Sequence, residues 1–342
     1  MIKAERLRQG DTVGIISPSS ALAGLVPHRL NAAVTNLESM GFKVKIGKNA
    51  TKVTEYTAGS AEERVEDIHA MFEDDEVRAI VCAIGGFHAN QIIDKLDYQL
   101  IAAQPKIFVG FSDISVLHFA LHTQSNLVTF YGPTAIPQFG SVFGVDAYTE
   151  AGFLKAVTQV EPIGEILPSE RWTEEMLDWF SKKDLERPQE MQPNSGYKWL
   201  CEGTAEGDLV GGCITSILHL RGTKYWPDFP GKIFFWEIPE SSADFSKGEP
   251  LSRVDAHLTD LALSGVFDEI AGMVIGRPRG YSESEAEKLH EVIHKYVGSR
   301  GYPVLFNVNI GHTDPITTLP LGVRARLDSS AKSFTILESA VK

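Results

Sequence analysis

The chain has 342 residues, a length that predicts two domains. Apolar residues make up 43% and charged residues 23%, as in soluble globular enzymes, which excludes a disordered chain, a collagen-like repeat and a disulfide scaffold. The formal charge of −13, without any cluster of Lys or Arg, argues against a nucleic-acid partner. No apolar run is long enough to span a membrane, and the charged N-terminus does not look like a secretory signal.

Cysteine usage indicates a reducing compartment. Only Cys82, Cys201 and Cys213 occur, an odd number without the spacing of a metal site. We therefore expect a cytoplasmic protein without structural disulfides.

The first 160 residues alternate between strand and helix patterns. A helical stripe ends near Gly41, and Ser60 with Glu63 forms a capping box before the next helix. Short apolar runs predict five strands, at residues 12–17, 42–46, 79–83, 106–109 and 127–131. This alternation predicts an α/β domain over residues 1–160 with a doubly wound, mostly parallel sheet.

The composition changes at about residue 161. Residues 161–202 are rich in Pro, Glu, Trp and Lys and include five aromatics, too many for a disordered tether, so we expect an ordered linker or lid. Residues 203–342 predict a smaller, mixed α/β domain. Its strands are expected at 232–237, 271–275, 303–308, 323–327 and 333–337, and its helices at 254–265 and 283–297.

Ser112 is the strongest candidate for chemistry. It follows a buried strand that ends at Gly110, and an apolar helix begins directly after it. A serine on such a turn is held exposed beside helix N-terminal N–H groups, which can stabilise an oxyanion. The alternative is that Ser112 or Asp113 simply caps the helix. The pattern G-F-S-D differs from the G-x-S-x-G of α/β-hydrolases.

Gly85 and Gly86 follow the preceding strand at the same edge of the sheet. Two glycines allow close approach of a ligand to the backbone and offer a free N–H, although a plain tight turn would also use them. Neither a G-x-G-x-x-G fingerprint nor a phosphate-binding loop occurs, so no nucleotide cofactor is expected.

A serine nucleophile needs a general base, and the sequence pattern alone does not determine which histidine serves as that base. His118 and His122 lie on the helix after Ser112 but point away from its tip. His312 lies in a loop bounded by glycine and proline, where either a catalytic group or a surface histidine could stand. Glu237 ends an apolar strand and is expected to have a partner if it is buried.

One motif matches a zinc-protease pattern. His290, Glu291 and His294 spell H-E-x-x-H. The apolar face of this helix puts these three residues on its flank and outer side, so we interpret them as a solvated helix face. Inhibition by chelators would distinguish a metalloprotease from this interpretation.

Several segments together resemble one family, the serine peptidases that comprise LD-carboxypeptidases and microcin C immunity proteins. The similarity covers nearly the whole chain in order. It lies in residues 10–18, 85–91, 96–98, 105–114, 130–133, 211–212, 235–237, 275–277, 311–315 and 319–322.

The resemblance implies a catalytic triad of Ser112, Glu237 and His312, at a junction between the two domains. It also implies an oxyanion hole made by the backbone N–H groups of Gly86 and Asp113. Family members use no metal or other cofactor and are commonly homodimers, so a cytoplasmic, homodimeric serine carboxypeptidase is expected.

The substrate depends on the branch of the family. LD-carboxypeptidases usually carry an arginine after the paired glycines, whereas here residues 88–91 read His-Ala-Asn-Gln, which is closer to the immunity branch. The predicted substrate is a peptidyl aminoacyl nucleotide such as processed microcin C, and the alternative is a murein tetrapeptide that loses its terminal D-alanine. A non-catalytic binding protein is a rival from another class. The residues expected to bind substrate are Gly85, Phe87 and Asn90, with an aromatic from among Trp172, Tyr197 and Trp199.

Overall fold

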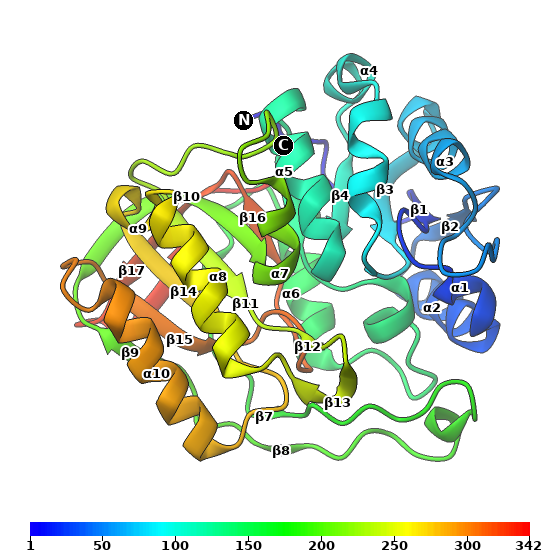
Figure 1. Ribbon diagram of the computed structural model, residues 1–342. Helices are drawn as coiled ribbons and strands as arrows, with labels where there is room; N and C mark the ends of the chain where they lie inside the picture. The colour runs from blue at the N-terminus through cyan, green and yellow to red at the C-terminus, as the bar shows by residue number, and fades with distance from the viewer.

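The computed structural model describes residues 1–342 and contains two large sheets, one formed mainly by each half of the chain (Figure 1). The termini lie together at the top of the view, where the backbone of Lys342 bonds with Ala4 and Arg6. No helix combines the length and the apolar character needed to cross a bilayer.

The first sheet has the order β16-β5-β4-β3-β1-β2, and all of its neighbouring pairs except β16–β5 are parallel. The doubly wound, mostly parallel fold predicted for this half is confirmed. Its strands are β1 (Thr12–Ile16), β2 (Lys43–Ile46), β3 (Val77–Cys82), β4 (Ile107–Gly110), β5 (Thr129–Tyr131) and β16 (Leu319–Leu321).

Helices cover both faces of this sheet. Helix α2 begins at Pro27, a residue suited to the first helical turn, and the Ser60–Glu63 capping box starts α3 as predicted. The helices are α1 (Leu22–Leu25), α2 (Pro27–Ser39), α3 (Ala61–Glu73), α4 (Tyr98–Ala103), α5 (Ser115–Ser125) and α6 (Ala147–Thr158), with short 3₁₀ or π turns η1 (Ala89–Gln91), η2 (Ile93–Lys95), η3 (Ser112–Ile114) and η4 (Ala135–Phe139).

The second sheet has a parallel centre, β10-β11-β14-β15, with antiparallel strands on both sides. Its full order is β6 (Gly164–Glu165), β18 (Ser333–Ile336), β17 (Arg324–Asp328), β10 (Thr204–Cys213), β11 (Ile233–Glu237), β14 (Gly272–Gly276), β15 (Val304–Val308) and β9 (Lys198–Cys201). Strand β10 was not predicted, because three glycines and two acidic residues weaken its strand pattern.

The remaining elements lie around the second sheet. Helices α8 and α10 lie side by side across its front in Figure 1. These elements are α7 (Ile214–Ile217), η6 (Leu218–Leu220), α8 (Leu251–Leu263), α9 (Val266–Glu269), α10 (Glu283–Val297), the hairpin β12 (Glu240–Ser241) and β13 (Asp244–Gly248), and, in residues 161–202, β7 (Arg171–Trp172), η5 (Lys183–Leu185) and β8 (Gln192–Pro193).

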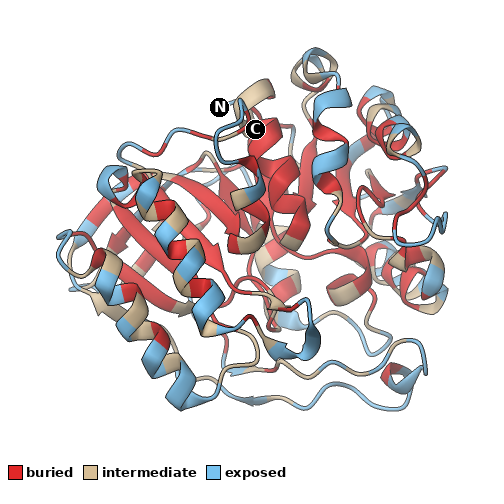
Figure 2. Ribbon diagram, viewed as in Figure 1, coloured by how far each residue is buried: buried red, intermediate tan, exposed pale blue.

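Sheet membership does not follow the boundaries that composition predicted. Strands β6 and β9 lie within residues 161–202 but join the second sheet, whereas β16 leaves the second half and pairs with β5. One apolar core of 88 buried residues runs through both sheets, as the continuous red interior of Figure 2 shows. The two halves are therefore packed as one body, and their carboxyl-end loops are held against each other.

We expect Gly211 to be essential for this packing. It lies in β10 with a φ of +155°, and an added Cβ would lie 1.8 Å from the carbonyl oxygen of Phe235 in the neighbouring strand. Gly211→Ala should therefore destabilise the protein by about 3 kcal/mol or more in denaturant unfolding. At Gly222 an added Cβ would meet nothing within 4 Å, although its φ is +78°. Gly222→Ala should therefore lower the free energy of unfolding only by the strain of a left-handed alanine, about 1–2 kcal/mol. Equal losses in the two variants would contradict this explanation.

Candidate active site

Ser112 lies on a strained turn between β4 and α5. Its φ is +64°, a left-handed conformation that is strained for a non-glycine residue and that recurs at active sites. The turn packs so tightly against Gly85 that a Cβ there would come within 2.7 Å of the Ser112 Cβ. The Ser112 hydroxyl makes no capping bond to the helix and instead faces His312.

Three side chains form a hydrogen-bonded chain. The Oγ of Ser112 lies 2.9 Å from Nε2 of His312, and Nδ1 of His312 lies 2.7 Å from Oε2 of Glu237. Because an ionised carboxylate can only accept, Nδ1 of His312 carries the proton. Its Nε2 is then free to accept the hydroxyl proton of Ser112, which is the arrangement that a general base requires.

Glu237 is completely buried at the end of β11. Its Oε2 accepts from His312, and its Oε1 accepts from the hydroxyl of Tyr131 at 2.6 Å. Burial, followed by the nearby Glu237 carboxylate, raises the pKa of Tyr131 well above its usual value, so the phenol remains a donor. The buried carboxylate thus has a partner on each oxygen, as expected for a charge removed from water.

The environment of His312 favours its charged form. Burial lowers the pKa of the ring, but the Glu237 and Glu240 carboxylates together outweigh it, and the pKa is raised above 6.5. Glu240 lies at 4.0 Å from Nε2 of His312 and also faces the Nε of Arg279 at 3.7 Å. An imidazolium formed beside Ser112 would therefore be stabilised.

Backbone N–H groups converge near Ser112. The N–H of Gly86 makes no hydrogen bond within the chain, and that of Asp113 lies in the first turn of a 3₁₀-helix, where such groups lack helical partners. The Asp113 carboxylate, itself buried, accepts from Ser19 and from the backbone N–H groups of His88 and Ala89 at 2.6–2.9 Å. Asp113 therefore fixes the glycine loop relative to the Ser112 turn.

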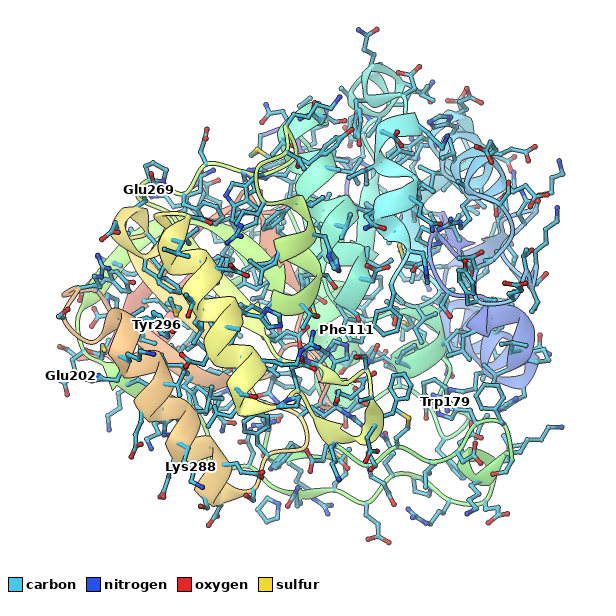
Figure 3. All side chains as sticks on the ribbon, viewed as in Figure 1. Phe111, Trp179, Glu202, Glu269, Lys288 and Tyr296 are labelled. Carbon is cyan, nitrogen blue, oxygen red and sulfur yellow. The ribbon has the colours of Figure 1, made fainter.

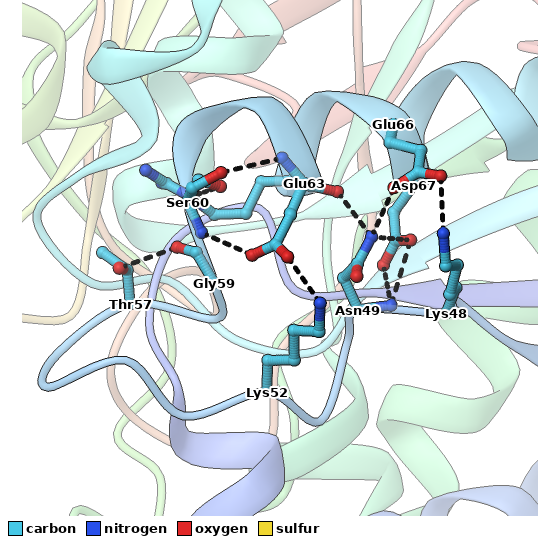
Figure 4. A network of polar contacts seen from close by, with 10 residues as sticks. Lys48, Asn49, Lys52, Thr57, Gly59, Ser60, Glu63, Glu66 and Asp67 are labelled. Atoms are coloured by element: carbon cyan, nitrogen blue, oxygen red, sulfur yellow. Dashed lines mark hydrogen bonds and ion pairs between the residues drawn. The ribbon is translucent and has the colours of Figure 1, made fainter.

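Helix α3 contacts the loop that follows Gly85 and Gly86. Arg64 donates to the carbonyls of Pro18 and His88 and to the side chain of Gln91. Figure 4 shows the capping box that starts this helix, together with the contacts of Asn49 to Asp67 that attach the helix to the preceding loop. The position of the glycine loop thus depends on a polar network rather than on the loop alone.

The other candidate histidines have structural surroundings. Nε2 of His118 bonds the carbonyl of Gly110 at 2.9 Å inside the core, and burial lowers the pKa of His118 to about 4. Burial likewise lowers the pKa of His122 to about 4. Neither histidine contacts Ser112, so the structure brings only His312 to it.

The H-E-x-x-H helix lacks the arrangement of a metal site. Glu291 and His294 are exposed, and His290 packs edge-on against Phe306. The one group of three possible metal ligands in the chain is Cys213, Glu237 and His312, whose ligand atoms lie within 4.8 Å of one another. Two of these residues are already joined by a hydrogen bond, and burial raises the pKa of the Cys213 thiol well above its usual value, so this set favours proton transfer over metal binding.

A cavity of about 770 Å³ opens at the hydrogen-bonded chain. Gly85, Gly86, Phe87, Ser112, Asp113 and His312 all line it, as do residues from both halves of the molecule. Figure 3 shows Phe111, which precedes Ser112, near the centre of the molecule between the two halves. The predicted location of the site at their junction agrees with this geometry.

Four residues expected to bind substrate do not line the cavity: Asn90, Trp172, Tyr197 and Trp199. Tyr197 and Trp199 pack against the core, and Trp172 stacks on the guanidinium of Arg277 at 4.5 Å. Trp179 and Phe180 line the cavity instead. The sequence-based prediction named Trp172, Tyr197 and Trp199 and left out these two aromatics, because the segment lacks a period that would tell an inward from an outward side chain.

Residues 173–189 cross the cavity as a strap and are attached at both ends. Thr173 exchanges backbone hydrogen bonds with Asp314, and Glu174 accepts from the N–H of Gly280. At the other end, Asp184 pairs with Arg29 of α2 at 2.8 Å. This course is visible along the bottom of Figure 1.

Comparison with known proteins identifies the class. Residues 13–132 match the model of the LD-carboxypeptidase N-terminal domain, and residues 206–327 match that of the C-terminal domain. Together with the doubly wound fold, these matches define a serine carboxypeptidase.

Relatives of two kinds match almost the whole chain. A probable murein peptide carboxypeptidase of Bacillus subtilis is 33% identical over 98% of this chain and 94% of its own length. The microcin C7 self-immunity protein of Escherichia coli is 29% identical over 98% of this chain and 95% of its own length. A structure of a variant of the latter protein with adenosine monophosphate superposes with a TM-score of 0.89 at 28% identity, covering all of both chains. The chain belongs to the LD-carboxypeptidase family.

We predict that His312 titrates above the ordinary histidine range and that Glu240 contributes to this shift. The Glu240→Gln variant removes one raising charge without touching the His312–Glu237 bond, so the pKa of His312 should fall. NMR of histidine-labelled protein measures both titrations. Glu291→Gln on α10 is the matched control and should leave the titration unchanged. A His312 pKa that is the same in wild type and Glu240→Gln would contradict the assignment.

Proposed function

We propose that the protein is a serine carboxypeptidase in which Ser112 is the nucleophile, His312 the general base and Glu237 the residue that orients the imidazole. Ser112 attacks the carbonyl carbon of the scissile bond while His312 takes its proton, and the leaving group departs with that proton. Water then attacks the acyl-enzyme, again with His312 as base. In both steps the Gly86 and Asp113 N–H groups donate hydrogen bonds to the carbonyl oxygen and stabilise its negative charge.

The observation that carries this proposal is the chain of contacts from Ser112 through His312 to Glu237, with separations of 2.9 and 2.7 Å. The positive φ of Ser112 supports it, because this strained turn aims the hydroxyl at His312 instead of at the helix. The fixed tautomer of His312 supports the direction of proton transfer.

We further propose that the substrate is a peptidyl aminoacyl nucleotide, cut between its last amino acid and the nucleotide. Trp179 supports this choice, because its side chain lines the cavity. The guanidinium carbon of Arg29 lies 4.5 Å from the centre of the indole ring and covers one of its faces. An indole ring is a π-surface on which a nucleobase could stack. The Escherichia coli relative, whose name describes microcin immunity, has been crystallised with adenosine monophosphate and with aspartyl sulfamoyl adenosine.

The second candidate is release of terminal D-alanine from a murein tetrapeptide. The Bacillus subtilis relative named for murein peptides is slightly more similar in sequence than the immunity protein, at 33% against 29% identity. Both substrates need the same three residues at the scissile bond. They differ in the leaving group, which is a nucleotide in one case and a single amino acid in the other.

The Ser112→Ala variant tests the reaction. We expect it to lower kcat by roughly 10⁴- to 10⁶-fold, because the remaining groups cannot replace the nucleophile. Thermal unfolding should show an intact fold. A folded Ser112→Ala variant with more than about a tenth of wild-type activity would exclude Ser112 as nucleophile.

The Trp179→Ala variant tests the substrate. Stacking of a base on an aromatic contributes about 1–3 kcal/mol, so kcat/KM for a peptidyl aminoacyl nucleotide should fall about 5- to 150-fold. Turnover of a murein tetrapeptide, which has no flat π-face, should change little.

Trp172→Ala is the matched control, since its ring stacks on Arg277 outside the cavity. It should affect both substrates alike. Equal losses on both substrates in Trp179→Ala would refute nucleobase stacking, and robust wild-type release of D-alanine would favour the murein substrate.

A further inference from the structure

A second cavity lies at the end of the first sheet opposite to Ser112. It has a volume of about 260 Å³, and most of the side chains that line it are charged. It opens where the two termini of the chain meet, since Glu5 and Lys342 belong to its wall (Figure 1). Lys106, the one buried residue in its lining, directly precedes strand β4, whereas Ser112 follows the other end of that strand. This cavity is therefore separate from the candidate active site.

Lys106 is a buried amine without a carboxylate partner. The residue is only 6% exposed, and its Nζ donates a hydrogen bond to the backbone carbonyl of Asp74, the residue that ends helix α3. The carboxylate of Asp74 pairs instead with Lys45 and accepts from the N–H of Glu76. An ammonium removed from water loses its hydration, so a buried lysine without a carboxylate is unusual.

This environment favours the neutral amine. Burial is the largest influence on the pKa of Lys106, which falls to about 8. The carboxylates of Asp74 and Asp75 raise this pKa. The cations Arg78 and Lys45 lower it. A neutral amine has a lone pair and is a nucleophile, and near pH 8 its fraction is roughly 100-fold larger here than in an ordinary lysine.

The wall of this cavity contains donors that suit an anion. Arg78 of β3 makes neither an ion pair nor a side-chain hydrogen bond, and the same holds for the amide of Gln104. Lys342 faces Glu5 only at 3.9 Å, and both side chains are more than half exposed, so their pairing is weak. Three basic residues and two carboxylates line the cavity, a positive balance in a chain with a formal charge of −13. A guanidinium can hold two phosphate oxygens in parallel hydrogen bonds.

We propose that Lys106 is a modification site that takes an acyl group from a small acyl phosphate, with Arg78 holding the phosphate. The lone pair of Nζ attacks the acyl carbon. The bond from this carbon to the bridging oxygen breaks, and inorganic phosphate leaves with that electron pair. The amine loses one proton to solvent, and the product is a neutral amide without the positive charge of lysine. The step does not use Ser112, so it is independent of the proposed function.

Acetyl phosphate tests the reactivity of Lys106. Peptide mapping by mass spectrometry follows the acetylation of each lysine in the full-length protein. Lys332 is the internal control, because it is exposed and forms no ion pair. At pH 8 Lys106 should react at least about 10-fold faster than Lys332, since its larger neutral fraction outweighs its lower basicity. Its rate should level off above about pH 8, where the amine is already neutral. Equal rates at the two lysines would overturn the proposal.

A second acyl donor tests the role of Arg78. Acetic anhydride carries the same acyl group without a phosphate. Arg78→Gln should lower the ratio of the acetyl phosphate rate to the acetic anhydride rate at Lys106 by about 3- to 10-fold, as for loss of an ordinary hydrogen bond. Arg324→Gln, an exposed position outside the cavity, should keep this ratio.

Inorganic phosphate provides the competition experiment. It should protect Lys106 from acetyl phosphate but not from acetic anhydride. Thermal unfolding checks that Arg78→Gln, at an exposed position, is folded. An unchanged ratio in folded Arg78→Gln, or no protection by phosphate, would overturn the assignment of a phosphate-holding site.

Discussion

The buried carboxylate of Glu237 is the constraint on which the site depends. A charge with no exposure to water must be compensated, and here Tyr131 of the first sheet and His312 of the second half supply one donor to each oxygen. The same carboxylate therefore holds the histidine and joins the two halves of the chain. Loss of either donor would leave one oxygen of this buried carboxylate without a partner, which is costly for a charge removed from water.

The second element of the site is conformational strain supported by packing. Ser112 keeps its left-handed backbone because the tight contact with Gly85, the buried Ser115 and the polar network of Asp113 hold the turn on all sides. Ser115 bonds the carbonyl of Ser112 at 2.6 Å and accepts from the N–H of Cys213 at 2.9 Å, so the turn is also attached to β10. The proposed nucleophile and the proposed base are thus positioned by opposite halves of one continuous core.

Recognition of the substrate is distributed differently. The proposed reacting groups lie at the carboxyl ends of parallel strands, as is usual in α/β folds, whereas the strap and α8 contribute other parts of the cavity wall. The strap presents aromatic side chains to the cavity, and α8 with the turn before it presents polar ones. Within a family that contains both immunity proteins and murein peptidases, such peripheral elements can change specificity while the chemistry at the strand ends stays the same.

Local pattern determined the first sheet, the Ser60–Glu63 capping box, the helix at 283–297 and the turn at Ser112, because each depends on residues close together in the chain. The choice of His312 and Glu237 followed from family resemblance, since residue spacing says nothing about contacts across 75 or 200 positions. Only the tertiary structure decided that β16 crosses to the first sheet, that Trp179 rather than Trp172, Tyr197 or Trp199 lines the cavity, and that Lys106 and Arg78 line a second cavity with the terminal Lys342. These features depend on which elements pack together, and an irregular segment or a chain terminus carries no sequence period that reveals its neighbour.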